Sequence, residues 1–275
     1  MNKKNELKME SKMRELENKN IVITGASSGI GEKMAMLVAK RGARPILIAR
    51  SSDKLKTISE SIHAQTSANC LYYSLDVSDI ERVKKVFKQI REEVGHIDVL
   101  INNAGFGVFD SLQDATYADF EKMFAVNVMG LIACTKEALP SMLERNKGHI
   151  INIASQAGKL ATPKSSGYSA TKHAVLGFTN SIRLELMDTD IYVSAVNPGP
   201  IETNFFNIAD KSGNYVKNVE KYMLDADEVA EKVTKLILRP KRELNLPWWM
   251  NLGSVLYNLF PSIAERLFGK KFNMK

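Results

Sequence analysis

The chain has 275 residues, of which 44% are hydrophobic and 25% are charged, and its formal net charge is +7. This length and composition supply enough apolar material for one large α/β domain or two small ones, and they exclude a disordered protein. The positive charge favours anionic ligands or surfaces, among them phosphorylated cofactors, nucleic acid and acidic lipid, but does not choose among them.

The cysteines and the N-terminus bear on metal binding and on the compartment. Cys70 and Cys134 lie far apart and match no metal-ligand spacing, so we expect two reduced thiols that serve as packing residues, and no metal site. Residues 1–17 form a charged arm without the apolar stretch of a signal peptide, and no run of about 18 apolar residues occurs. We therefore expect a cytoplasmic protein, with attachment to a membrane surface left open.

From residue 18 onward, short apolar runs alternate with helical patterns. Strands are predicted at residues 21–24, 45–50, 70–77, 98–105, 149–155 and 191–199. Helices are predicted at residues 32–40, from 52, from 78, at about 116–145 and at about 168–187. This alternation predicts an α/β fold with a single domain at residues 18–245, a Rossmann-like, doubly wound parallel sheet with helices on both faces.

A glycine-rich turn joins the first strand to the first helix. In "TGASSGIG", Gly25, Gly29 and Gly31 have the spacing G-x-x-x-G-x-G. Glycines there permit a tight turn, and the helix N-terminus presents free N–H groups to a pyrophosphate. The predicted ligands of a dinucleotide in this turn are Gly25, Ser27, Ser28, Gly29, Ile30 and Gly31.

The end of the second strand indicates which dinucleotide is bound. In NAD-binding folds an acidic residue at this place accepts hydrogen bonds from the ribose, whereas Arg50 and Ser51 stand here. Arg50 can pair with a 2′-phosphate, and Ser27, Ser28 and Ser51 can add hydrogen bonds. The sequence therefore predicts NADP(H); the alternative is that Arg50 is an ordinary surface charge.

Tyr168 and Lys172 are four residues apart in the helix after the fifth strand. Residues at this spacing lie on one face of a helix, and a fixed ammonium favours the phenolate, so Lys172 is expected to lower the pKa of Tyr168 toward a useful acid or base. Ser155 ends the fifth strand, where its hydroxyl can hold a substrate oxygen. Taken alone, the pair better fits a packed tyrosine and a solvated lysine, because this spacing occurs by chance in many helices.

Together, "TGASSGIG", "NNAG", Asn127, Ser155, "YSATK" and "NPGPIET" resemble the classical short-chain dehydrogenase/reductase family over about residues 18 to 240. The resemblance implies that Tyr168 transfers the proton, Ser155 orients the carbonyl, Lys172 holds the nicotinamide ribose, and Asn127 supports a water relay to Lys172. The cofactor-binding residues that it further implies are Asp76, Val77, Asn103, Ala104, Gly105, Pro198, Ile201 and Thr203. Gly105 is also open to a purely structural interpretation.

The expected function is therefore reversible hydride transfer between NADP(H) and a carbonyl or alcohol substrate. The alternative is a non-catalytic NADP(H)-binding sensor or scaffold on the same fold. Dispersed basic residues argue against nucleic-acid binding. The resemblance also implies a substrate lid at about residues 200–225, whose aromatic residues suggest a lipophilic substrate, and a homodimer or homotetramer.

Residues 246–275 form an aromatic, basic C-terminal extension with both tryptophans of the chain. Three interpretations stay open for it. In the first, it is an amphipathic helix that contacts a membrane, and Lys270 and Lys271 anchor it to acidic lipid. In the second it covers the substrate pocket, and in the third it forms part of the dimer surface.

Overall fold

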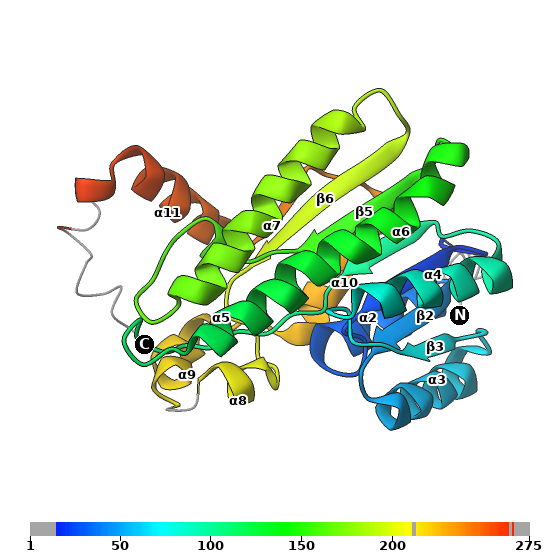
Figure 1. Ribbon diagram of the computed structural model, residues 1–275, viewed down its shortest axis with the longest axis horizontal. Coiled ribbons are helices and arrows are strands. Elements are labelled where there is room, and N and C mark those ends of the chain that lie inside the picture. Colours follow the sequence, from blue (N-terminus) through cyan, green and yellow to red (C-terminus); the bar gives the residue numbers. More distant parts are fainter. Residues whose placement is uncertain (1–14, 211–212, 264–265, 267–275) are drawn as a thin grey trace, which may run out of the picture.

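The structure, a computed structural model, describes residues 15–210, 213–263 and 266. A parallel sheet of seven strands in the order β3-β2-β1-β4-β5-β6-β7 runs through the part of the chain so described (Figure 1). The strands are β1 (Asn20–Thr24), β2 (Arg44–Ala49), β3 (Leu71–Ser74), β4 (Val99–Asn102), β5 (Gly148–Ile153), β6 (Ile191–Pro198) and β7 (Glu243–Leu246). The chain winds outward from β1 to β3 and then returns to β4, so the predicted doubly wound sheet is confirmed. Residues 1–14 of the predicted arm lie outside the described residues.

The seventh strand is an addition to the six that the sequence pattern predicts. In β7, Glu243 and Asn245 alternate with Leu244 and Leu246, so the strand shows no continuous apolar run. It pairs with the carboxyl half of β6, and its polar side chains take part in hydrogen bonds described below. Leu246, which we had placed at the start of the C-terminal extension, is the last residue of this strand.

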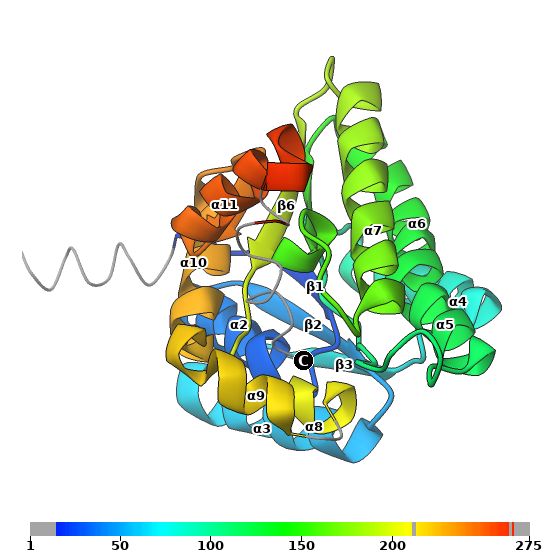
Figure 2. The same ribbon diagram turned by 90° about the vertical axis from the view of Figure 1, so that its left-hand side faces the viewer.

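Helices cover both faces of the sheet (Figure 2). One face is covered by α2 (Gly29–Lys40), α3 (Ser52–Thr66) and α10 (Ala226–Leu238). The other face is covered by α4 (Ile80–Val94), α6 (Leu131–Glu144) and α7 (Ser166–Glu185). These two layers bury both sides of every central strand, which explains why the strands read as apolar runs.

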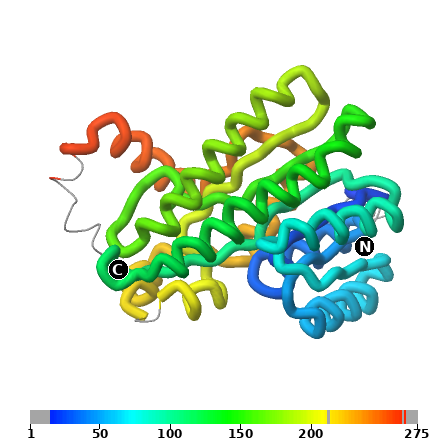
Figure 3. Tube along the Cα trace, in the orientation of Figure 1, coloured from blue at the N-terminus to red at the C-terminus, as the bar shows by residue number. Residues whose placement is uncertain are grey.

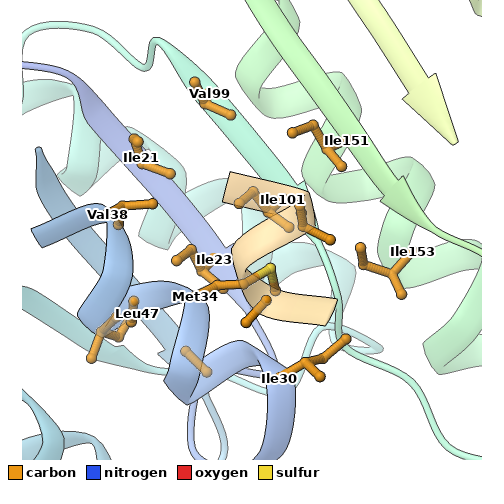
Figure 4. Packing of buried hydrophobic residues seen from close by; sticks show 14 of the residues in the cluster. Ile21, Ile23, Ile30, Met34, Val38, Leu47, Val99, Ile101, Ile151 and Ile153 are labelled. Carbon is orange, nitrogen blue, oxygen red and sulfur yellow. The ribbon is translucent and has the colours of Figure 1, made fainter. Parts of the chain in front are cut away.

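Successive side chains of the central strands point to opposite faces and thereby form two separate cores. Ile21 and Ile23 of β1 pack with Met34 of α2, whereas Val22 between them packs in the core under α4. Figure 4 shows the first of these cores, in which Ile101 of β4 lies beside the same residues. All five side chains are fully buried. The close packing holds the strands rigidly and so fixes the positions of the residues that follow their carboxyl ends.

The helix predicted at about residues 116–145 is interrupted in its middle. An α-helix, α5 (Tyr117–Phe124), passes into a single π-helical turn, η1 (Ala125–Gly130), before α6 begins. A π turn widens the helical repeat and often marks a functional position. Here it contains Asn127, one of the predicted site residues.

The segments that follow the strands gather at the carboxyl edge of the sheet. After β6 come two short helices, α8 (Phe205–Ala209) and α9 (Asn214–Val219), and the turn η3 (Glu220–Tyr222), which together occupy the region of the predicted lid. The chain then forms α10, β7 and a last helix, α11 (Trp248–Leu259). Figure 3 shows α11, in orange and red, at the end of the molecule opposite to β3.

Candidate active site

A cavity of ≈ 1130 Å³ opens at the carboxyl edge of the sheet. It is lined by nearly all the residues that the sequence singled out. These are Gly25, Ser27, Ser28, Gly29, Ile30, Arg50, Ser51, Asp76, Val77, Asn103, Ala104, Gly105, Ser155, Tyr168, Lys172, Pro198, Ile201 and Thr203. Gly31 and Asn127 are the exceptions, and each contacts a residue of the wall from behind.

The glycine-rich turn has a shape that larger residues cannot adopt. Gly25 and Gly29 have φ angles of +66° and +59°, in the left-handed region that glycine reaches without strain. A Cβ on Gly31 would lie 2.4 Å from the carbonyl oxygen of Gly25. Ser28 precedes α2 without forming a side-chain cap, so the first N–H groups of the helix can bind an anion. The turn therefore fits a pyrophosphate.

Asn103 has a structural part in this turn that the sequence did not reveal. Its side-chain amide donates to the carbonyl oxygens of Thr24 and Gly25, at 3.0 and 3.1 Å, and its backbone N–H donates to the Thr24 hydroxyl at 3.0 Å. The strand ends of β1 and β4 are tied together in this way. Asn103 thus fixes the backbone of the glycine turn and lines the cavity as well.

The far end of the cavity, beyond β2, is positively charged. Arg50 and Ser51 are exposed there, and Arg50 has no place among the ion pairs of the described chain. Lys54, which sequence reasoning missed, lines the same end one helical turn later. Asp76 accepts hydrogen bonds from the N–H and hydroxyl of Ser78, at 3.0 and 2.7 Å, which holds its carboxylate in place. This end fits a phosphate group on a ribose.

Ser155, Tyr168 and Lys172 meet at the other end of the cavity. Tyr168 and Lys172 project from the first turns of α7, and Ser155 follows the end of β5. The Lys172 ammonium donates to the carbonyl oxygen of Ile153 at 2.8 Å and lies 5.7 Å from the centroid of the Tyr168 ring. The structure thus places all three predicted catalytic side chains at one wall.

The electrostatics of this pair differ from the expectation that Lys172 lowers the pKa of Tyr168. Burial raises the pKa of the Tyr168 phenol, and the nearby Ser155 hydroxyl acts in the opposite direction without outweighing burial. Burial also lowers the pKa of Lys172 from 10.5 to about 8. The expectation is therefore wrong in sign for Tyr168, because it considered only the neighbouring charge and not desolvation.

Asn127 lies behind the wall, fully buried in the π turn. Its amide nitrogen donates to the carbonyl oxygen of Phe106 at 2.8 Å and to the Thr171 hydroxyl at 3.1 Å, and its oxygen accepts from the Phe106 N–H at 3.0 Å. Between Asn127 and Lys172 stands Gly105, where a Cβ would lie 3.1 Å from the Asn127 oxygen and 3.7 Å from the Lys172 nitrogen. The glycine leaves a narrow gap between the two polar groups.

An aromatic cluster covers Tyr168. The Phe109 ring lies 5.7 Å from Tyr168, 6.3 Å from Phe205 and 5.1 Å from Tyr215, measured between centroids. Phe205 and Tyr215 belong to the predicted lid, but Phe109 was missed, because it lies in a loop after β4 without any periodic pattern. The glycines in "NNAGFGVF" are the one signal for it, since a Cβ on Gly107 would come within 3.0 Å of the Tyr168 ring.

Helix α11 forms another part of the wall that the sequence could not place. Trp249, Met250 and Tyr257 of the helix and Phe260 directly after it line the cavity, and the Trp249 ring lies 6.1 Å from that of Tyr222 in η3. The interpretation that the extension covers the pocket is therefore consistent with the structure for the described part of the extension. Lys270 and Lys271 lie outside the described residues.

Other kinds of site receive no support within the described residues. No cluster of three or more His, Cys, Asp or Glu side chains there is arranged to hold a metal ion. None of the helices in the described ranges has the length and apolarity needed to cross a membrane. His149 is buried in β5, where its Nε2 lies 2.8 Å from the Ser194 hydroxyl.

Comparison with known proteins agrees with this geometry. A family model described as short chain dehydrogenase matches residues 19–212. The chain is 36% identical over 234 residues to the NADP-dependent 3-hydroxy acid dehydrogenase of Schizosaccharomyces pombe, which covers 82% of this chain and 90% of that protein.

Solved structures show the same similarity in three dimensions. The alcohol dehydrogenase of the archaeon Thermococcus sibiricus, complexed with 5-hydroxy-NADP, superposes with a TM-score of 0.74 and 31% identity over 83% of this chain and 96% of that chain. A short chain dehydrogenase/reductase from Burkholderia phymatum in complex with NAD has a TM-score of 0.83 and 25% identity over 90% and 96% of the two chains. The chain therefore belongs to the short chain dehydrogenase family of oxidoreductases.

Proposed function

We propose that the protein is an NADP(H)-dependent oxidoreductase that interconverts a ketone or aldehyde and an alcohol. The observation that carries this proposal is that Ser155, Tyr168 and Lys172 lie at the wall of the same cavity as the glycine-rich turn. A proton donor and a nucleotide site that share one cavity are what hydride transfer requires.

The cofactor would extend along the cavity from Arg50 to Tyr168. The glycine turn would hold its pyrophosphate, and Arg50 and Ser51 the 2′-phosphate of its ribose. The residues that would contact its remaining parts are Asp76 and Val77 at the adenine, Asn103 and Ala104 beside the adenine ribose, and Pro198, Ile201 and Thr203 at the nicotinamide. Gly105 lines the same cavity and is a further proposed contact. When bound, NADPH supplies the hydride. The S. pombe relative is NADP-dependent, but the B. phymatum structure holds NAD, so the preference for NADP(H) depends on Arg50.

The side chains of this protein would handle the proton. In the reductive direction Tyr168 donates its phenolic proton to the carbonyl oxygen, which the Ser155 hydroxyl polarises by a hydrogen bond. The Lys172 ammonium stabilises the phenolate that remains. Because the pKa of Lys172 is about 8, this group can also pass on a proton near neutral pH. A water in the gap beside Gly105 would connect it to Asn127.

The substrate is proposed to be lipophilic. Phe109, Phe205 and Phe206 surround the Tyr168 side of the cavity, and their rings lie within 6.3 Å of one another. Covering this apolar surface with an apolar part of the substrate removes it from water, which is favourable. The site therefore favours an apolar group next to the reacting carbonyl.

A homodimer or homotetramer is proposed, through α5, α6 and α7. These helices leave large apolar side chains exposed, among them Tyr117, Leu143 and Leu184. Light scattering of the purified protein measures the mass and tests this. A cytoplasmic location stays a prediction.

The test of the function is NADPH oxidation by the wild type and by Tyr168→Phe over a panel of aldehydes, ketones and quinones, with NADH as the cofactor control. Turnover that requires NADPH and that falls by at least about a hundredfold in Tyr168→Phe is the expected result. NADPH binding without any turnover that depends on Tyr168 would favour the sensor or scaffold instead.

A further inference from the structure

Helix α11 contacts its own domain through the polar Asn251 and Ser254 as well as through the half-buried Met250 and Tyr257. The side chain that α11 buries is Ser254, and the half-buried Asn251 one turn before it accepts a hydrogen bond of 2.7 Å from the Lys159 ammonium. Lys159 also binds Asn245 and Glu243 of β7. A surface helix of a globular protein normally buries its apolar side and exposes its polar one. α11 departs from this arrangement, because its one fully buried side chain is polar while most of its large apolar side chains stay exposed.

The apolar side of α11 faces outward. Trp248, Leu252, Val255 and Leu259 follow one another at the spacing of a single helix face, and they are 73%, 52%, 45% and 64% exposed. No charged residue occurs between Asn245 and Ile263. The described helix therefore presents a continuous apolar stripe, which we call the outer face, of a kind that marks an interaction surface.

The outer face meets the rim of the cavity. Trp249, Leu256 and Phe260 both line the cavity and are about half exposed, so they form a shared edge between the two surfaces. Figures 1 and 2 show that α11 lies at the margin of the fold, where it contacts the edge strand β7. Whatever covers the outer face consequently borders the opening that leads to Tyr168.

The charge of the following sequence points to a lipid surface as the occupant. Residues 264–275 contain Arg266, Lys270, Lys271 and Lys275 against the single acid Glu265. An apolar helix rich in tryptophan and followed by basic residues suits the headgroup region of an anionic bilayer.

We propose that the outer face of α11 inserts into the surface of an anionic lipid bilayer. In this position the shared edge brings the mouth of the cavity to the boundary between lipid and water. If the carbonyl reduction proposed above is correct, a substrate dissolved in the bilayer can then reach Tyr168 without crossing water. This second step rests on the proposed function, whereas lipid binding does not.

The two tryptophans of the chain, Trp248 and Trp249, both lie in α11, so selectively excited tryptophan fluorescence reports on this helix alone. The full-length protein is titrated with vesicles of phosphatidylcholine containing phosphatidylserine, and binding is measured in parallel by co-sedimentation. A blue shift of the emission, and quenching by lipids with brominated acyl chains, are expected. An unchanged spectrum with no co-sedimentation overturns the proposal, and equal binding to vesicles of phosphatidylcholine alone overturns the part assigned to the basic tail.

Leu252→Ser/Leu259→Ser is the variant that tests the outer face. Both leucines are exposed and line no part of the cavity, so folding and the cavity are preserved. The vesicle partition coefficient is expected to fall at least about tenfold, since two large apolar groups are withdrawn from the lipid. Leu112→Ser is the control at a leucine that is 74% exposed in the loop between β4 and α5, and its partition is expected to equal that of the wild type. Equal loss in both variants, or in neither, contradicts the proposal.

Substrate delivery is tested with hexadecanal dissolved in the vesicles and butanal in water. NADPH oxidation with hexadecanal is expected to fall at least about tenfold in Leu252→Ser/Leu259→Ser, with the butanal rate unchanged. Equal rates for wild type and variant with both aldehydes overturn delivery from the bilayer. Absence of any Tyr168-dependent oxidation alongside normal vesicle binding counts against the proposed function and leaves the lipid contact standing.

Discussion

Replacement of Lys172 by methionine tests how strongly burial disfavours the charge of this residue. Burial lowers the pKa of Lys172 from 10.5 to about 8, so the folded protein holds a charge that its surroundings disfavour. One pKa unit corresponds to 1.36 kcal/mol, and the difference therefore amounts to about 3 kcal/mol. Methionine removes this penalty, but it also removes the hydrogen bond to the Ile153 carbonyl, which costs about 1–3 kcal/mol.

The dependence on pH isolates the charge from the hydrogen bond. Between pH 8 and 10.5 the unfolded chain binds a proton at Lys172 that the folded protein has lost, so the free energy of unfolding of the wild type rises with pH in this window. Lys172→Met lacks this contribution. The stability of the variant relative to the wild type is thus greatest below pH 8 and declines by about 3 kcal/mol as the pH reaches 10.5.

Urea unfolding followed by circular dichroism, at several pH values from 7 upward, measures this difference. Lys122→Met serves as the matched control for the loss of a lysine, because Lys122 is exposed on α5. A difference for Lys172→Met that stays constant within about 1 kcal/mol over the same window would refute the claim that burial disfavours this ammonium.

Three further outcomes are expected. Gly31→Ala places a Cβ 2.4 Å from the Gly25 carbonyl oxygen and should weaken NADPH binding at least about tenfold by calorimetry, whereas Gly177→Ala, which meets nothing within 4 Å, should leave it unchanged. Arg50→Asp should reduce the preference for NADPH over NADH in binding about 10- to 100-fold, since a carboxylate repels the 2′-phosphate and accepts ribose hydroxyls; an unaltered ratio would show that Arg50 does not contact the phosphate. Because burial lowers the pKa of His149 from 6.5 to about 3, the wild type should lose stability as the pH falls through this window, and His149→Gln should lose less in urea unfolding at matched pH. Equal acid losses in both proteins would contradict the burial argument.

Local sequence was sufficient for the parts of the site that depend on short-range geometry. The glycine spacing predicted the turn, since three positions must tolerate unusual backbone angles or close contacts whatever surrounds them. The interval between Tyr168 and Lys172 predicted a common face, because helix geometry alone sets it. Apolar runs predicted six strands, as central parallel strands are covered on both faces.

Long-range packing decided what these signals could not. β7 was missed because its alternating residues do not form an apolar run, and its pairing partner lies far away in the chain. Phe109 was missed because a loop residue gains its role from the lid that folds onto it. The pKa of Tyr168 was predicted in the wrong direction, because its burial depends on elements distant in sequence.

The C-terminal extension shows the division most clearly. The sequence by itself determined that residues 248–263 are apolar, rich in tryptophan and free of charge, which predicts an amphipathic helix. Only the tertiary structure decided which side of this helix meets the protein, because that choice depends on Lys159, which binds Asn251 from another part of the chain. An amphipathic pattern specifies two faces, and the neighbours that a fold supplies determine which of them is left to the surroundings.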